Sequence, residues 1–420
     1  MGSRAGMRIG VVGGGIGGLA FALALQQRGL GCEVFEAASE VREIGVGITL
    51  LPHAMRELAR LGLQAPIEAQ GIANQESVFF NRHGQFVYRE PRGRHAGYDH
   101  PEVGIHRGRL HLTMYREALA RLAPGSIHTG LRCAGVVQDE AGATVQFVSM
   151  QSGDALPPRR FDLVVACDGV NSAIRRQFYP HEALAFAGIN LWRGVTRHRP
   201  ILTGRSYLRI GSIDTGKMVI YPIANDVNAQ GMQLINWVAE LRRADAVMND
   251  WNQRGNVDDF IDIFKDWRFD WLDVPALISN AETVLEYPMV DKDPVLQWTF
   301  GRVTLLGDAA HPMYPRGSNG SAQALIDARV LAEALAALSP GDDPRAALQA
   351  YEASRRPATA RVVETNRSTP PDFIIMKADE LSGGQPFRHI DDLISQDALR
   401  QISDNYKTIA GFSLEAMRPA

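Results

Sequence analysis

The stretch RIGVVGGGIGGLAFALALQQRGLGCEVFE, residues 8–36, decides the fold. Its first five residues predict a buried strand, and LAFALALQQRG predicts a helix that ends at Gly29, a common C-terminal cap. The segment CEVFE then predicts a second strand. A strand, a glycine turn, a helix and a second strand in 29 residues form a βαβ unit of a parallel sheet.

The glycines of this unit follow the spacing G-x-G-x-x-G at Gly13, Gly15 and Gly18. The first glycine permits a tight turn, the second lets the backbone approach a pyrophosphate, and the third lets helix and strand pack closely. Glu36, at the end of the second strand, can accept hydrogen bonds from a ribose diol. Because strand, helix and acid are all in place, a dinucleotide site is favoured over a purely structural turn, with NAD and FAD both open.

Two later segments carry further loop signals. FDLVVACDG, residues 161–169, predicts a strand followed by the turn Asp168-Gly169. GDAAHPMYPRGSNG, residues 307–320, lies between the strand-like GRVTLL and the helical SAQALIDARVLAEALAAL. A glycine loop that enters a helix commonly binds an anion or a polar ring edge. The chain therefore carries two such loops.

The three segments, in this order, resemble the group A flavoprotein aromatic hydroxylases, the salicylate and para-hydroxybenzoate hydroxylase family. The resemblance spans about residues 7–367. Within that family, EPRG, IHRG, WRGVT, EYPMVDKDP and GRVTLLGDAAHPMYPRGSNG are similar to phenazine-carboxylate monooxygenases. The resemblance implies FAD as cofactor and an α/β fold. A Rossmann-like FAD-binding domain of the glutathione-reductase type would carry an inserted, mostly antiparallel substrate sheet and a C-terminal helical region.

The resemblance also implies how FAD lies. The first loop would bind the pyrophosphate, and Asp308 would accept hydrogen bonds from the ribityl hydroxyls. The N–H groups that open the helix after the second loop would face the flavin N1–C2 edge, where the negative charge of reduced flavin is stabilised. Cys167 stands where the family usually has alanine, and Arg109 is a near neighbour that could take the role of Arg107. The expected cofactor residues are Gly13, Gly15, Ile16, Gly17, Gly18, Glu36, Ala37, Arg42, Val46, Gly47, Arg107, Cys133, Asp168, Gly307, Asp308, Pro315, Gly317, Gly320, Ser321 and Ala322.

The implied activity is NAD(P)H-dependent hydroxylation of an aromatic or N-heteroaromatic ring by dioxygen, through a flavin C4a-hydroperoxide. NADH or NADPH would bind transiently, because no further glycine cluster has the context of a nicotinamide domain. No side chain is singled out as a chemical catalyst, because the cofactor carries the hard chemistry. The expected substrate contacts are Trp192, Arg193, Tyr221, Met289, Met313 and Pro315. Trp192 and Arg193 point to opposite faces of their strand, and Arg193 suits a carboxylate unless it pairs with a protein acid.

The domain prediction is discontinuous. Residues 7–187 and 286–367 form the FAD-binding domain, with some substrate strands interleaved, residues 188–285 form the substrate sheet, and residues 368–420 form a C-terminal helical segment. The oligomeric state stays open, with a dimer as one candidate.

Composition narrows the class of protein. The net charge of −3 over 420 residues gives no electrostatic case for nucleic acid or an anionic membrane. Three separated cysteines without a C-x-x-C pair argue against disulfides and a cysteine metal site, and fit the cytoplasm. Three alternatives remain. The first is a flavin-dependent halogenase or another FAD oxidoreductase, although the W-x-W-x-I-P motif of the halogenases is absent from this sequence. The second is an NAD dehydrogenase, and the third is an escort-type protein of similar fold that binds no FAD.

Overall fold

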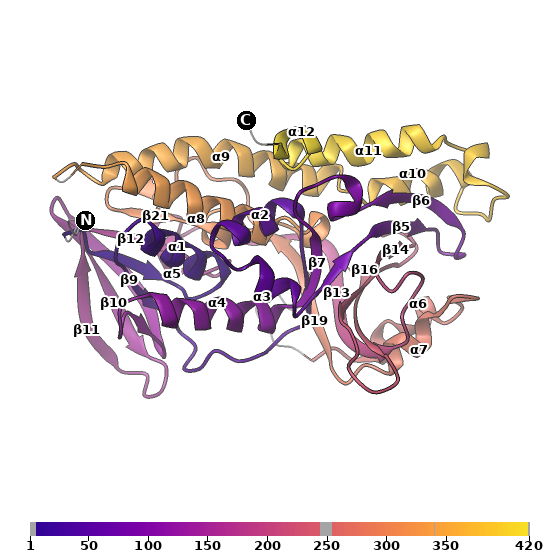
Figure 1. Ribbon diagram of the computed structural model, residues 1–420, viewed down its shortest axis with the longest axis horizontal. Helices are drawn as coiled ribbons and strands as arrows, with labels where there is room; N and C mark the ends of the chain where they lie inside the picture. The colour runs from indigo at the N-terminus through magenta and orange to yellow at the C-terminus, as the bar shows by residue number, and fades with distance from the viewer. Residues whose placement is uncertain (1–5, 244–253, 340, 419–420) are drawn as a thin grey trace.

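The computed structural model describes residues 6–243, 254–339 and 341–418. The predicted substrate domain includes residues 244–253, and the predicted C-terminal segment includes residues 419–420, which lie outside the described residues. The molecule is elongated, with two sheet-containing halves side by side and a row of helices along one long side (Figure 1).

The first half contains a six-stranded sheet in which β1 (Ile9–Val12) lies between β12 (Leu163–Ala166) and β2 (Glu33–Phe35), all parallel. Helix α1 (Ile16–Gln27) packs against α4 (Arg107–Arg121) and α8 (Gly320–Ala336). This arrangement confirms the βαβ unit. The sheet is completed by β8 (Ile127–His128), β20 (Thr299–Phe300) and β21 (Val303–Leu305), and it is accompanied by α5 (Ala173–Phe178) and a separate sheet of β9 (Leu131–Asp139), β10 (Gly142–Ser149) and β11 (Ala155–Phe161).

The second half is built on a seven-stranded sheet of order β19-β13-β16-β15-β14-β5-β6. Every neighbouring pair is antiparallel except β14 and β5, which run parallel. The strands are β5 (Glu76–Phe80), β6 (Phe86–Pro91), β13 (Ala185–His198), β14 (Ser206–Ile210), β15 (Lys217–Ala224), β16 (Gln233–Arg242) and β19 (Val284–Asp291). The sheet thus recruits β5 and β6 from far upstream of residue 188 and continues to Asp291.

One face of this sheet is covered by short elements, among them α6 (Ile261–Phe264) and α7 (Val274–Ser279), which bury a core that includes Trp192 and Trp237. Residues 257–264 form a turn of 3-10 helix followed by α6, and α7 follows ten residues later. The remaining short elements of both halves are β3 (Gly47–Leu50), α2 (Pro52–Arg60), α3 (Gln64–Glu68), β4 (Ile72–Asn74), β7 (Glu102–His106), β17 (Arg268–Phe269) and β18 (Leu272–Asp273).

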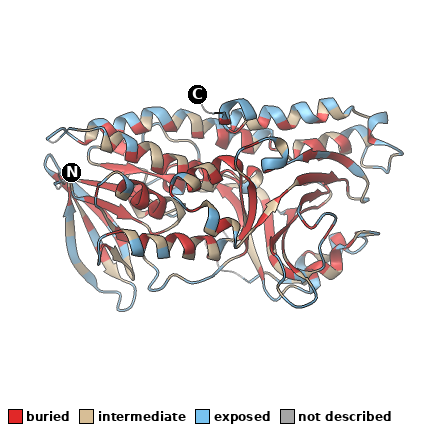
Figure 2. Cartoon of the chain, viewed as in Figure 1, coloured by how far each residue is buried: buried red, intermediate tan, exposed pale blue. Residues whose placement is uncertain are grey.

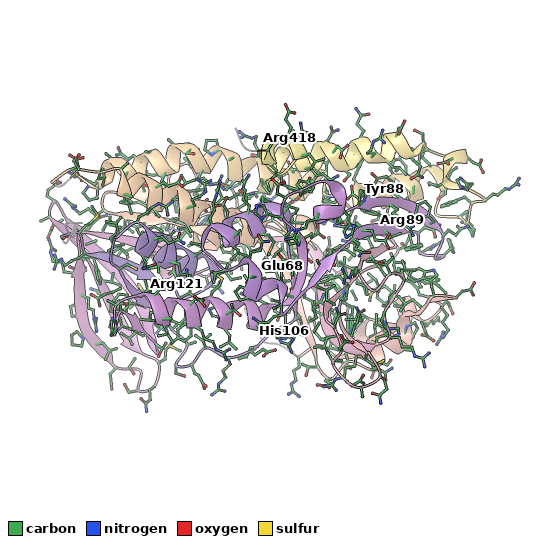
Figure 3. The ribbon with its side chains drawn as sticks, in the orientation of Figure 1. Glu68, Tyr88, Arg89, His106, Arg121 and Arg418 are labelled. Atoms are coloured by element: carbon green, nitrogen blue, oxygen red, sulfur yellow. The ribbon has the colours of Figure 1, made fainter. Side chains whose placement is uncertain are left out.

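The C-terminal helices form the long side of the molecule. Helix α9 (Arg345–Ser368) runs over the first half, and α10 (Phe373–Ser382), α11 (Gln396–Ile409) and α12 (Leu414–Met417) continue over the second (Figure 1). Their inner faces are buried and their outer faces exposed (Figure 2). Tyr88 on β6 lies beneath them and joins their apolar cluster (Figure 3). None of the described helices is long and apolar enough to cross a membrane.

Candidate functional site: a cofactor cradle between two glycine loops

The first glycine loop has the geometry that its spacing predicted. Gly13 has a φ of +105°, and a Cβ there would lie 2.3 Å from the carbonyl oxygen of Cys167. A Cβ at Gly18 would lie 2.0 Å from the carbonyl oxygen of Gly13. Gly15 differs, because a Cβ there would meet no protein atom within 4 Å. Gly13 and Gly18 are therefore required by the fold, whereas Gly15 faces open space at the start of α1, whose N-terminus has no side-chain cap.

Glu36 is fixed beside this loop. Its carboxylate accepts hydrogen bonds from the backbone N–H of Gly14 (2.7 Å) and of Ala38 (2.7 Å). The first bond ties Glu36 to the glycine turn, and the second ties it to the residue after Ala37. On the other side, the His111 Nε2 lies 2.6 Å from the Gly14 carbonyl oxygen. His111 was not predicted, because it is 97 residues from the loop and follows no motif.

Asp168 lies next to the first loop, since a Cβ at Gly13 would be 3.0 Å from its backbone nitrogen. Its Oδ2 accepts from the Ala173 N–H (2.8 Å), while its Oδ1 is buried without a hydrogen-bond partner. Burial raises the pKa of this carboxyl. The fully buried Arg175 then donates to the carbonyl oxygens of Ala309 (3.0 Å) and Ala310 (2.6 Å). One short helix thereby connects the aspartate turn to the second glycine loop.

The second loop presents unused polar groups. Gly307 adopts a φ of +63°, and the exposed Asp308 carboxylate has no hydrogen-bond partner among the described residues. A Cβ at Gly320 would lie 3.8 Å from Asp308 Oδ1, so the carboxylate faces the start of α8. That helix has no side-chain cap, and its first N–H groups, which include those of Ser321 and Ala322, remain available for a ligand.

A buried ionic network supports the second loop from behind. Asp327 on α8 accepts from the Gly307 N–H (3.2 Å), faces His311 Nε2 (2.5 Å) and pairs with Arg355 of α9 (2.7 Å). Burial alone would raise the pKa of Asp327, but the contacts with His311 and Arg355 outweigh it and lower the pKa. Sequence reasoning missed this network, since its members are separated by up to 48 residues and show no shared spacing.

The three arginines near the loops differ in their partners. Arg42 is exposed and pairs with Glu40 (2.8 Å), and Arg109 pairs with Glu43 (2.8 Å). Arg107, exposed at the first position of α4, has no side-chain partner within the described part of the chain. It follows His106, which Figure 3 labels near the junction of the two halves. Of the two candidates, Arg107 is therefore the one whose guanidinium is free for a ligand.

The two halves meet at the start of β3. The Val46 carbonyl oxygen accepts from the Arg107 N–H (2.9 Å). The Gly47 N–H donates to Asn236 Oδ1 (2.7 Å), and the Gly47 carbonyl oxygen accepts from Arg193 Nη2 (2.7 Å). Asn236 and Arg193 both come from the seven-stranded sheet, which therefore contacts the predicted flavin edge directly.

The inner face of the sheet carries Tyr221 and Met289, packed in a cluster with Tyr314. Burial raises the pKa of Tyr221 to about 12, which the charge of Arg193 partly opposes. Met313 is half-buried and Pro315 exposed, and both flank Tyr314 on the second loop. Tyr221 and Met289 thus share a cluster with the second loop through Tyr314, and Met313 and Pro315 are its neighbours in sequence.

Two of the predicted site side chains are placed elsewhere. Trp192 is fully buried on the opposite face of the sheet and stacks on Phe260 with ring centroids 4.9 Å apart. The prediction that it contacts substrate is corrected, because the face covered by α6 and α7 is a closed core. The Cys133 side chain is also in the core, with its thiol directed to the Gly135 carbonyl oxygen (3.7 Å), so it is not available to a cofactor. Gly317 is buried.

Comparison with known proteins agrees with this geometry. A family model described as an FAD binding domain matches residues 7–207 and 288–366. The chain belongs to the FAD-dependent aromatic monooxygenases. It is 39% identical over 362 residues to the phenazine 1,6-dicarboxylic acid hydroxylase PhzS of Lysobacter antibioticus, covering 85% of this chain and 88% of that protein. It is 31% identical to the 3-hydroxybenzoate 6-hydroxylase of Polaromonas naphthalenivorans, covering 85% and 86%.

Solved structures share the fold. The Klebsiella pneumoniae protein HpxO, complexed with FAD and uric acid, superposes with a TM-score of 0.71 at 23% identity, covering 98% of this chain and 95% of that one. The predicted family, α/β fold and FAD cofactor are thus confirmed. The NAD dehydrogenase, halogenase and escort-protein alternatives are set aside.

The residues of this structure suit FAD. The open space at Gly15, the uncapped N-termini of α1 and α8, the orphaned Asp168 Oδ1 and the unpartnered Asp308 carboxylate offer donors and acceptors from both loops. FAD, reduced by NAD(P)H, supplies oxygen-atom transfer from dioxygen to an aromatic substrate.

Proposed function

We propose that this monooxygenase hydroxylates a polycyclic N-heteroaromatic acid of the phenazine-carboxylate class. The observation that carries the proposal is the state of Arg193. Its Nη2 donates to the Gly47 carbonyl oxygen (2.7 Å), its charge faces the Tyr221 hydroxyl, and its Nε is buried without a hydrogen-bond partner among the described residues. No acidic side chain of the described residues forms an ion pair with it.

A half-buried cation without a counter-ion is costly, because its desolvation is not repaid by a charge partner. A substrate carboxylate would supply that partner, and the planar guanidinium can bind it through two parallel hydrogen bonds. The alternative that Arg193 pairs with a protein acid loses its support, since within the described part of the chain its guanidinium meets a backbone carbonyl and a tyrosine hydroxyl but no carboxylate. The PhzS relative is named for a dicarboxylic acid of this class.

The inner face of the sheet suits a flat ring system. Tyr207 and Tyr221 stack with ring centroids 5.0 Å apart and an interplanar angle of 7°. Leu191 and Met289 extend the same apolar cluster. Aromatic and thioether side chains pack favourably against π-systems. We therefore assign the rings to this face and the acid group to Arg193.

The cofactor residues retain the roles predicted for them. The Gly13–Gly18 loop would bind the pyrophosphate, Glu36 the adenosine ribose and Asp308 the ribityl chain. The N–H groups of Gly320 to Ala322 would face the flavin. Arg107 would reach the middle of the cofactor. The assignments of the first loop, Asp308, the start of α8 and Arg107 are supported by open space or by polar groups without a partner among the described residues. Glu36 differs, because each of its carboxylate oxygens already accepts from a backbone N–H and would use a remaining lone pair for the ribose.

The proposal is tested by replacing Arg193 and comparing an acid with its amide. In Arg193→Met, the Michaelis constant should rise far more for phenazine-1-carboxylate than for the neutral carboxamide, with an unchanged FAD spectrum. Arg197→Met, on the same strand but exposed and paired with Glu282, is the matched control and should change neither constant. Equal losses for acid and amide would refute the assignment. Absence of substrate-stimulated NAD(P)H oxidation with any tricyclic acid would refute the substrate class.

NADH or NADPH would bind only transiently, so its oxidation should accelerate when substrate is present. The chain would work in the cytoplasm, which its three free cysteines suit. A dimer is the assembly to test by sedimentation.

A further inference from the structure

The C-terminal segment reaches the second glycine loop through one side chain. Tyr406 on α11 is 4% exposed, and a Cβ at Gly317 would lie 1.4 Å from its hydroxyl oxygen. Position 317 must therefore be glycine, because any side chain there would prevent this tyrosine from packing against the loop backbone. The contact joins segments 89 residues apart in the chain.

The Tyr406 hydroxyl uses both its donor and its acceptor. It donates to Asn366 Oδ1 (2.7 Å) and accepts from Asn319 Nδ2 (2.9 Å). The Asn366 Nδ2 then donates to the Tyr314 carbonyl oxygen (3.2 Å), and the Asn319 Nδ2 also donates to that of Gly317 (3.1 Å). One hydroxyl thus orients two buried amides, which hold two carbonyl groups of the loop.

The network extends to α2. Asn319 Oδ1 faces His53 Nε2 at 2.9 Å, and burial lowers the pKa of His53 to about 3. The imidazole is therefore neutral, and it must carry its proton on Nε2 to donate to this oxygen. Its ring stacks on Phe412 of the C-terminal segment, with centroids 4.8 Å apart. Two residues beyond position 400 thus support the loop: Tyr406 through its hydroxyl, and Phe412 through the His53 ring.

Asn319 is also the N-cap position of α8, whose first N–H groups face the predicted flavin edge. We propose that Tyr406 is a positioning residue for the flavin: through Asn319 and Asn366 it fixes the 314–319 loop and the start of α8, so that the C-terminal segment completes the cofactor site. Tyr406 lies outside the matched FAD domain, which ends at residue 366. The inference does not depend on which aromatic substrate is used.

The test removes the hydroxyl alone. Tyr406→Phe should weaken FAD binding to the apoprotein about tenfold, measured by quenching of flavin fluorescence, which corresponds to about 1.4 kcal/mol. The reduction potential of the bound flavin should become more negative, because the α8 N–H groups that stabilise the anionic reduced form are less well placed. Ser403→Ala is the matched control, since its buried hydroxyl on the same helix α11 donates to Glu90 Oε2 (2.6 Å) without touching the loop.

The proposal is supported if Tyr406→Phe shifts FAD affinity and potential while Ser403→Ala shifts neither. It is overturned if Tyr406→Phe leaves both quantities unchanged, or if the two variants lose affinity equally, which would indicate general loosening of the C-terminal segment. If Tyr406→Phe does not fold, Asn366→Ala tests the same link from α9. An unchanged potential in that variant would also overturn the proposal.

Discussion

Replacing Asp308 by alanine isolates its contribution to cofactor binding. The carboxylate is exposed and has no hydrogen-bond partner among the described residues, so its removal orphans no protein donor. The free energy of unfolding of the apoprotein should therefore change by no more than about 0.5 kcal/mol. A hydrogen bond from a ligand hydroxyl to a carboxylate is worth about 1.5–3 kcal/mol. The dissociation constant of FAD should accordingly rise about 10- to 150-fold.

The assay is titration of the apoprotein with FAD, followed by flavin fluorescence, with urea unfolding of the apoprotein in parallel. Asp262→Ala removes another exposed acid, on α6 and away from both loops, and controls for the change in net charge. Asp308→Asn should fall between the wild type and the alanine variant, because the amide oxygen still accepts. A dissociation constant for Asp308→Ala within twofold of wild type would refute a role for this carboxylate. A large loss of apoprotein stability would show that the residue acts on the fold instead.

Two further predictions concern the first loop and the C-terminal segment. Gly15→Ala should leave apoprotein stability unchanged, since its Cβ would meet no protein atom within 4 Å, but it should abolish FAD retention by filling the space for the pyrophosphate. Gly31→Ala, where a Cβ is equally unobstructed, is the control, and a Gly15→Ala protein that still holds FAD would contradict the prediction. Burial alone would raise the pKa of Asp372, yet Lys217 and Arg209 hold it below its ordinary 3.8, so the ion pairs stabilise the fold above about pH 4 and this stabilisation is lost at lower pH. Urea midpoints at pH 7, 5 and 3.5 should fall less steeply toward acid in Asp372→Asn than in wild type, and parallel profiles would contradict the assignment.

The parts of the site that sequence predicted are those with local causes. The strand, the turn and the helix of residues 8–36 follow from apolar runs and from glycines that only a tight turn requires. Gly13 confirms this reasoning, since its positive φ and its closeness to Cys167 exclude any side chain. Local sequence also placed Asp308 before the loop that opens α8.

The parts that sequence missed depend on the tertiary arrangement. The strand period put Trp192 and Arg193 on opposite faces, but only the packing of α6 and α7 determines which face is the closed core. Likewise, β5 and β6 join a sheet formed mainly by residues more than 100 positions later, and parallel pairing of β5 with β14 has no local signal. The partners Arg175, Asp327 and Arg355 are ordinary charged residues until the fold brings them to one loop.

These long-range partners have a common consequence for the cofactor. The second glycine loop has no side-chain cap of its own and is held by α5 through Arg175, by α9 through Arg355 and by α11 through Tyr406. These contacts fix the loop backbone, so the N–H groups at the start of α8 stay available to a ligand. Because a ligand that binds only the folded state stabilises it by mass action, FAD should stabilise all three helices together. Loosening any one of them should in turn weaken FAD binding.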